Sequence, residues 1–479
     1  MRKLLVLLFF TFHFSFFISC FGQASYNWTI LNSGMAGNNP VVKALVDNTV
    51  GITYDSLFAG GHFKTSGGIV TNNIALWRND LYAWFAMGSG VDSEVDAIAQ
   101  YNHKIYAGGM FDTAGGVHAN YVASWDSIKW DSLLGGVNGN IYAMTVYNNA
   151  LYVGGSFTMA NGITVNRIAK WNDTVWSSVG SGFDSNTVYA LAVYNDTLYA
   201  GGSFTKSNGK PVNYIAKWNG TTWDSVGHGM NNTVYALSVS NNLLVAGGAF
   251  TKTGAVGVNF IASSNGQLWD SIGAGVNDTV RALGPGSNYL AGIIKRTHSF
   301  CDNSFMLLAG GNFTKAWGKP IKNYAVYFWG VDTVWRGLGA INAPVYSLSP
   351  GSPNFNYESS NYIGGSFDTV NGNLNANYIA KIGFIFGSGI QSLSNNSDVN
   401  VYPNPSSGNF EFQIKNFESG KLNVQVYNVL GEQVYNSPLT IHHSPFTIDL
   451  SNQPNGVYVY RVMSNNGNLI GEGKIIIQK

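Results

Sequence analysis

Residues 198–230 read LYAGGSFTKSNGKPVNYIAKWNGTTWDSVGHGM and contain the repeat from which the fold can be predicted. A glycine pair, Gly201 and Gly202, is followed by two tryptophans, Trp218 and Trp223, and closely related phrases stand upstream and downstream. The glycine pairs of seven such phrases begin at Gly60, Gly108, Gly154, Gly201, Gly247, Gly310 and Gly364. These positions are 46 to 63 residues apart, and a repeat of this period indicates a solenoid, a propeller or an array.

Four segments within one repeat have strand patterns. Residues 188–193 (VYALAV) alternate in polarity, and residues 197–204 follow them after a tight Tyr-Asn-Asp turn. Residues 214–219 and 221–227 form the third and fourth segments, joined by an Asn219-Gly220 hairpin turn. Four antiparallel strands in each repeat of this length are typical of a β-propeller blade.

The tryptophan of the fourth strand predicts how the propeller closes. The matching residues are Trp28, Trp84, Trp130, Trp176, Trp223, Trp269 and Trp335. Trp28 precedes the first glycine pair, whereas the seventh repeat ends NYIAKIGFIFGSGI without a matching tryptophan. We therefore predict an all-β, seven-bladed propeller in which the N-terminal strand completes the last blade, so that no blade edge stays unpaired.

The N-terminal residues and the composition indicate an exported protein. Arg2 and Lys3 precede the apolar segment 4–18, so residues 1–24 have the features of a signal peptide. The alternative is a lipoprotein signal acylated at Cys20, and no later segment has the length of a membrane span. Once the signal is removed, Cys301 has no cysteine partner for an intramolecular disulfide. The net charge of +1 and the lack of a basic tract argue against nucleic-acid binding.

The last part of the chain differs in composition from the repeats. The propeller is predicted to span residues 25–387, and a Ser/Asn-rich linker, residues 388–398, follows it. Residues 399–479 alternate as strands separated by turn signals, which predicts a small C-terminal Ig-like β-sandwich.

Two resemblances can be stated from these phrases. The phrases VYPNP, VYNVLGEQV, PNGVYVYRV and KIIIQK closely resemble the type A C-terminal sorting domain of the type IX secretion system of Gram-negative bacteria. The residues that carry this motif are Tyr402, Pro403, Asn404, Pro405, Gly408, Gly431, Gly456 and Tyr458. The resemblance implies the type IX translocon as partner, passage across the outer membrane, and a secreted or surface location. The alternative is an ordinary adhesive sandwich. The repeats resemble kelch repeats and those of fungal cortical polarity-marker proteins, which implies a fold and not a function.

The repeat symmetry separates scaffold positions from candidate sites. A phenylalanine follows the glycine pair in all seven repeats, and an asparagine precedes each third strand, so both positions are predicted to serve the blade. The alternative for them is one sugar-sized pocket per blade. The innermost strands break the symmetry, because the residue after the leading Val or Ile differs between repeats. These candidate ligand-binding residues are Lys43, Asp96, Tyr142, Tyr189, Tyr235, Arg281 and Tyr346.

These seven residues, the ring residues, have two interpretations that both remain open at the level of sequence. Its charges and phenols either bind a polar ligand at the channel mouth or pair with one another along an ordinary channel wall. Long loops between the first and second strands of repeats one, six and seven are a second candidate recognition surface.

No enzyme motif with a complete residue set is present. The chain lacks G-x-S-x-G, Walker and H-E-x-x-H motifs, and we expect no cofactor and no metal site. His298 and Cys301 have ligand-like spacing, but two ligands rarely hold zinc. The sequence predicts a secreted or surface propeller that binds a glycan or a protein. The alternative is a carbohydrate-active enzyme that uses Asp96, Lys43, Arg281 and the ring tyrosines.

Overall fold

The computed structural model of the protein describes residues 24–48, 56–184, 186–285, 306–329, 334–350, 358–372, 374–386, 399–414, 420–428, 432–441, 445–464 and 469–479. Every regular element within these ranges is a β-strand. The chain divides into two compact units, Met1–Phe386 and Gly387–Lys479. The predicted signal peptide up to residue 23, Cys20, His298 and Cys301 lie outside the described residues.

The first unit is built from four-stranded antiparallel sheets, of which the described residues form seven. The innermost strands are β3 (Val41–Asn48), β9 (Val95–Tyr101), β15 (Ile141–Tyr147), β21 (Val188–Tyr194), β27 (Val234–Ser240), β33 (Val280–Pro285) and β39 (Val345–Pro350). The second strands are β4 (Ser56–His62), β10 (Lys104–Gly109), β16 (Ala150–Gly155), β22 (Thr197–Gly202), β28 (Leu243–Gly248), β34 (Met306–Gly311) and β40 (Glu358–Gly365).

The outer half of each sheet comes from the third and fourth strands. The third strands are β7 (Ile74–Arg78), β13 (Val122–Trp125), β19 (Ile168–Trp171), β25 (Ile215–Trp218), β31 (Ile261–Ser264), β37 (Tyr324–Phe328) and β43 (Ile379–Phe386). The fourth strands are β8 (Ala83–Ala86), β14 (Trp130–Ser132), β20 (Trp176–Ser178), β26 (Trp223–Ser225), β32 (Trp269–Ser271), β38 (Trp335–Arg336) and β1 (Ala24–Ile30). The N-terminal strand β1 therefore completes the sheet of β39, β40 and β43, as predicted.

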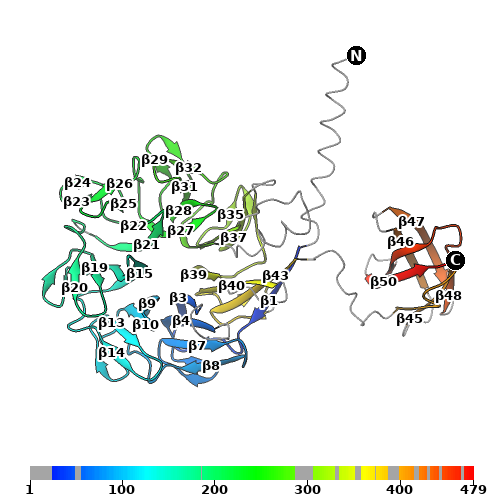
Figure 1. The fold of residues 1–479 in the computed structure, drawn as a ribbon, viewed down its shortest axis with the longest axis horizontal. Coiled ribbons are helices and arrows are strands. Elements are labelled where there is room, and N and C mark those ends of the chain that lie inside the picture. The colour runs from blue at the N-terminus through cyan, green and yellow to red at the C-terminus, as the bar shows by residue number, and fades with distance from the viewer. Residues whose placement is uncertain are drawn as a thin grey trace, which may run out of the picture. The chain divides into compact units, whose positions relative to one another are not determined.

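The sheets are arranged in a ring. Each innermost strand contacts the innermost strand of the next sheet, in the order β3, β9, β15, β21, β27, β33 and β39, and β39 contacts β3 again. Figure 1 shows the sheets radiating from this centre, with β1 beside β43 where the two ends of the ring meet. The prediction of an all-β propeller is confirmed.

The glycine pairs explain how the sheets approach one another. A Cβ on the first glycine of each pair would come within 3.0 Å of the β-branched residue that leads the next innermost strand. For Gly364 that residue is Val42, so the same contact occurs at the closure of the ring. A Cβ on the second glycine would collide with the carbonyl oxygen of the residue before a leading Val or Ile, as Gly202 would with Thr187. Only glycine fits both positions.

The fourth-strand tryptophans link each sheet to its neighbour by one repeated hydrogen bond. The Nε1–H of Trp223 donates to the carbonyl oxygen of Val179 at 3.1 Å, and that oxygen belongs to the residue after β20. All seven tryptophans make the equivalent bond, at 2.6–3.2 Å. Trp28 donates to Leu338, so β1 occupies the fourth-strand position in its side-chain contacts as well as in its backbone pairing.

Two connections differ from what the sequence predicts. A two-stranded hairpin follows the second strand of each sheet, and β23 (Lys206–Ser207) with β24 (Lys210–Pro211) is one example. The others are β5 (Thr65–Ser66) with β6 (Ile69–Val70), β11 (Thr113–Ala114) with β12 (Val117–His118), β17 (Met159–Ala160) with β18 (Ile163–Thr164), β29 (Lys252–Thr253) with β30 (Val256–Gly257), β35 (Lys315–Ala316) with β36 (Lys319–Pro320), and β41 (Thr369–Val370) with β42 (Leu374–Asn375). A third short strand, β2 (Met35–Ala36), pairs with β5.

The Asn219-Gly220 turn is part of a four-residue loop, because Trp218 pairs with Trp223 and the Asn219 side chain accepts backbone hydrogen bonds.

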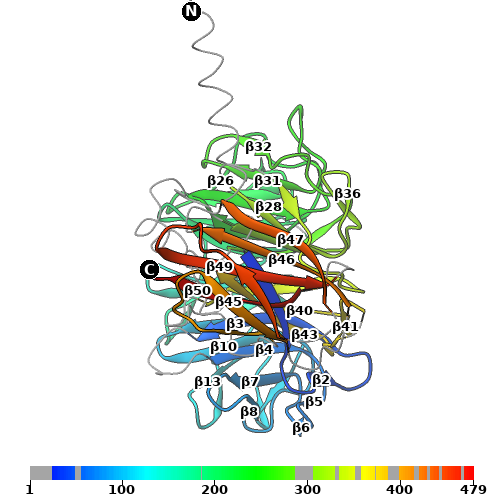
Figure 2. The same ribbon diagram turned by 90° about the vertical axis from the view of Figure 1, so that its right-hand side faces the viewer.

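The second unit is a small sandwich of two sheets, as predicted. Its strands are β44 (Val399–Tyr402), β45 (Asn409–Ile414), β46 (Gly420–Asn428), β47 (Gln433–Ile441), β48 (Phe446–Asp449), β49 (Gly456–Ser464) and β50 (Leu469–Ile477). One sheet has the order β44-β45-β48 and the other β47-β46-β49-β50, whose arrows are visible in Figure 2. Alternate residues of both sheets, such as Phe410, Val424 and Tyr460, form a common buried core.

Candidate functional site

All seven predicted ring residues occupy the same backbone feature. The pairing of each innermost strand with its second strand shifts register at one point, between Val42 and Ala44 in the first sheet. The ring residue is the one skipped at this shift in every sheet, as Lys43 is here. Such a β-bulge redirects a side chain out of the regular alternation. The second glycine of the pair faces the backbone just before each bulge. Six of the seven ring residues are half-buried, and the Asp96 side chain is only 5% exposed.

One arc of the ring is an ion-pair cluster. Lys43 Nζ lies 2.9 Å from Asp96 Oδ1 and 3.0 Å from Glu94 Oε2. Burial raises the pKa of Asp96, and the charge of Lys43 offsets this only in part. Burial also lowers the pKa of Lys43, but the two carboxylates outweigh it and leave that pKa raised. Asp96 Oδ2 is buried without a hydrogen-bond partner.

A second arc of the ring is aromatic and ends on a cation. The Tyr142 and Tyr189 ring centroids are 5.3 Å apart, and those of Tyr189 and Tyr235 are 5.2 Å apart. Arg281 Cζ lies 4.5 Å from the centroid of the Tyr235 ring, which is a cation–π contact. Arg281 Nε donates to Asn312 Oδ1 at 3.2 Å. The half-buried Tyr346 joins neither arc through any contact within the described ranges.

Two members of this site were not predicted from the sequence. Glu94 lies two residues before Asp96 and shares Lys43 with it. Asn312 occupies the variable position of the glycine phrase, where other repeats carry residues such as Ser203 or Ala249. Comparison of that position across the repeats was the signal that could have found it.

The ring residues and the starts of the long loops lie at opposite ends of the innermost strands. Ring residues lie at the beginning of the innermost strands, whereas the loops begin where those strands end, at Asn48, Pro285 and Pro350. Most of the loop residues themselves, 49–55, 286–305 and 351–357, lie outside the described residues.

The positions shared by every repeat have structural partners. The phenylalanines are at most 1% exposed and belong to the core; they are Phe63, Phe111, Phe157, Phe204, Phe250, Phe313 and Phe367. The asparagines all have positive φ; they are Asn72, Asn120, Asn166, Asn213, Asn259, Asn323 and Asn377. The side chain of Asn213, for example, donates to the carbonyl of His228 in the segment that leads to the next sheet. They therefore connect successive sheets, whereas the sequence predicted local caps.

The sorting-motif residues of the tail attach one loop to the last strand. Asn404 Nδ2 donates to the Lys474 carbonyl at 2.7 Å, and Asn404 Oδ1 accepts from Ile476 N at 2.8 Å. Ser406 continues the attachment through Ile476 and Gln478. A Cβ on Gly408 would collide with the backbone of Ser451.

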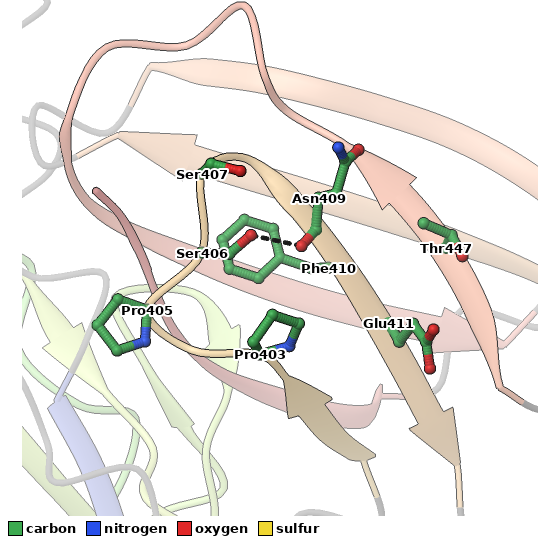
Figure 3. Close-up of a pocket in the computed structure, with 8 residues that line it drawn as sticks. All are labelled: Pro403, Pro405, Ser406, Ser407, Asn409, Phe410, Glu411 and Thr447. Atoms are coloured by element: carbon green, nitrogen blue, oxygen red, sulfur yellow. Dashed lines mark hydrogen bonds between the residues drawn. The ribbon is translucent and has the colours of Figure 1, made fainter. Parts of the chain in front are cut away.

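The other motif residues lie close to the same end of the sandwich. Gly456 begins β49 and pairs with Ile477, and the Tyr458 hydroxyl donates to the Pro454 carbonyl at 2.8 Å. Gly431 lies outside the described residues. A hollow of about 420 Å³ adjoins the loop, and Figure 3 shows Pro403, Pro405 and Glu411 among the residues around it.

Two kinds of feature are absent from the part of the chain that the structure describes. No group of three or more His, Cys, Asp or Glu side chains is arranged there to hold a metal ion. Among the same residues, no helix has the length and hydrophobicity that a membrane span requires.

Sequence comparison finds one family match in each of the two units. Residues 400–478 match the family model of the secretion system C-terminal sorting domain. Residues 86–234 match that of the Rax2 C-terminal beta propeller domain. No curated protein is significantly similar to the chain.

Solved structures provide distant likenesses. PorZ, a surface component of the type IX secretion system of Porphyromonas gingivalis, is 11% identical, with 88% of this chain and 64% of PorZ covered and a TM-score of 0.33. This chain thus spans less than two thirds of the length of PorZ. A fungal AA5-family alcohol oxidase in complex with copper is 12% identical, with 96% of this chain and 100% of the oxidase covered and a TM-score of 0.40.

The tail identifies the route that the protein takes. A type IX C-terminal sorting domain directs its protein through the type IX secretion system of a Gram-negative bacterium. The chain is therefore a propeller protein that is exported to the cell surface or secreted.

Proposed function

We propose that this exported propeller is a binding module whose ligand, a glycan or a surface protein, contacts the ring at the bulges of the innermost strands. The observation that supports it best is the aromatic arc Tyr142–Tyr189–Tyr235 ending on Arg281. The bulges are common to all sheets, but the side chains on them are not. A set of half-buried phenols beside a cation offers flat apolar surface together with polar groups that orient a ligand.

The test is a binding screen of the full chain against a glycan array and against proteins of the outer surface of neighbouring cells. Tyr189 contacts both neighbouring tyrosines, so Tyr189→Ala removes the middle of the arc. We expect it to weaken binding about fivefold or more, because aromatic contacts of this kind contribute about 1 kcal/mol beyond burial. Tyr26→Ala is the matched control, since Tyr26 lies exposed on the outer strand β1. Equal effects of the two changes would reject the ring as the binding site.

The second candidate function is a carbohydrate-active enzyme, supported by the buried Asp96 carboxyl with its raised pKa and its unpaired Oδ2. A carboxyl of this kind is suited to general acid–base catalysis. In this proposal Asp96 exchanges the proton, while Lys43, Arg281 and the tyrosines hold the glycan. The test is release of new reducing ends from any glycan that binds. Turnover that Asp96→Asn abolishes would establish the enzyme, and binding without turnover would reject it.

A further inference from the structure

We infer that the ligand of the aromatic arc is an acidic glycan, in which a sugar ring lies against the tyrosines and its carboxylate or sulfate pairs with Arg281. This inference rests on the proposed function and specifies the class of ligand. The inference follows from a difference between the two cations among the ring residues: Lys43 is paired with carboxylates, and Arg281 is not paired with any within the described residues.

Arg281 has donors to spare and a fixed position. A guanidinium carries five N–H donors, and Nε is the one that Asn312 occupies. Within the described residues no carboxylate lies within ion-pairing distance of Arg281. The Tyr235 ring beneath Cζ and the bond to Asn312 hold the guanidinium in place, so little entropy is lost when an anion binds.

Lys43, the other cation among the ring residues, is already paired with carboxylates. Lys43 lies within 3.0 Å of two carboxylates, Asp96 and Glu94, so this cluster has no positive charge to offer an anion. An acidic group is therefore attracted to the Arg281 end of the arc and repelled from the Asp96 side. This polarity gives a ligand a defined orientation along the arc.

The aromatic arc selects the remainder of the ligand. Tyr142, Tyr189 and Tyr235 come from three successive sheets, so the arc spans more than one sugar unit could cover alone. The apolar face of a pyranose packs on aromatic rings as other flat apolar surfaces do. A bidentate guanidinium bond to a carboxylate or sulfate then distinguishes acidic from neutral sugars.

The experiment compares matched ligands by calorimetric titration of the full chain. The pairs are an oligogalacturonate and its methyl ester, a sulfated galactan oligosaccharide and its desulfated form, and sialyllactose and lactose. We expect at least one acidic member to bind about tenfold or more tighter than its neutral partner, because a hydrogen bond to a charged group contributes about 1.5–3 kcal/mol. Raised salt should weaken the acidic member and leave the neutral one unchanged.

Variants assign the effect to its residue. Arg281→Gln should lower the affinity for the acidic member to that of its neutral partner, and Asn312→Ala should lower it in part because the guanidinium loses its anchor. Arg336→Gln is the matched control: Arg336 also lies over an aromatic ring, that of Phe328, but on an outer strand. Thermal melting of each variant verifies that it is folded.

The outcomes separate this inference from the function on which it rests. If acidic and neutral members bind equally and only Tyr189→Ala weakens them, the inference is overturned and the binding module stands. If neither Tyr189→Ala nor Arg281→Gln changes the affinity of a glycan that binds, the acidic-glycan inference and the proposed binding site are both overturned. If none of the six probes binds, the acidic-glycan inference is overturned. The proposed binding module then requires a protein ligand from the screen against outer-surface proteins.

Discussion

The first glycine of each pair is the residue on which the spacing of the sheets depends. Gly201 Cα faces Val234 of the next sheet, and a Cβ there would lie 2.6 Å from Val234 Cγ1. The sequence alone places these glycines in every repeat, but their partner on the neighbouring sheet lies 33 residues away and is known only from the packed ring.

Gly201→Ala is expected to destabilise the propeller by about 1–3 kcal/mol, as overpacking a close contact does. The measurement is the free energy of unfolding in denaturant. The matched control is Gly257→Ala, because a Cβ on Gly257 meets nothing within 4 Å and its φ is not in the left-handed range. Equal stability of the Gly201 variant and the wild type would contradict the packing argument.

The charge of Lys43 is expected to compensate a buried carboxylate. Lys43→Met leaves Asp96 ionised and unpaired at neutral pH, which should cost about 1–3 kcal/mol. Without Lys43, burial raises the pKa of Asp96 further, so the carboxyl takes up a proton as the pH falls and the loss should shrink. In the wild type the pKa of Lys43 is raised from 10.5, so its contribution is present below that pH and is lost as the pH rises through the raised value.

Denaturation curves over a range of pH check this expectation. Lys43→Arg keeps the positive charge and is the control, with a much smaller loss at neutral pH. A loss in Lys43→Met that is the same at acidic and neutral pH would show that Asp96 is not the cause.

At the scale of elements, β1 serves as the outer strand of a sheet formed by the end of the propeller. Trp28→Ala removes the bond to Leu338 and the edge-to-face contact with Tyr324, whose ring centroid is 6.0 Å away. We expect a loss of about 3 kcal/mol, at the lower end of the range for large aromatic residues because Trp28 is half-buried. Trp176→Ala is the comparison, since Trp176 makes the same bond between two sheets away from the closure.

The same denaturation experiment tests whether the closure holds in solution. A large loss for Trp176→Ala together with none for Trp28→Ala would mean that β1 is not docked. A chain that begins at Leu31 should be less stable than one that begins at Ala24, and it should self-associate in gel filtration, because the edge of β43 is then unpaired.

The elements that the sequence predicts are those with a strong period or with a side chain that recurs in the other repeats. The four strands per repeat and the displaced β1 follow from alternation and from Trp28. The short hairpins, such as β23 with β24, have only two residues per strand, too few to produce a pattern. The bulges were missed because a one-residue register shift depends on the facing glycine, not on the strand that carries it.

For the whole molecule, repeat symmetry predicts where a site can be but not what it does. The seven ring positions stand out in the sequence because they break the repeat. The separation into a Lys43–Asp96 cluster and a Tyr142–Tyr189–Tyr235–Arg281 arc depends on side-chain contacts between different sheets, and no local pattern contains them.

The tail predicts the fate of the whole protein in the cell. Deletion of residues 401–479 removes the sorting domain and leaves the propeller strands intact, so the truncated chain should accumulate in the periplasm. Asn404→Ala should reduce export in part, because the loop of residues 402–406 loses both bonds from Asn404 to the last strand. Lys421→Ala, on an exposed position of β46, is the control and should be exported normally. Cell fractionation followed by immunoblotting measures each chain, and the truncated chain at the cell surface in wild-type amounts would show that export depends on a signal elsewhere in the protein.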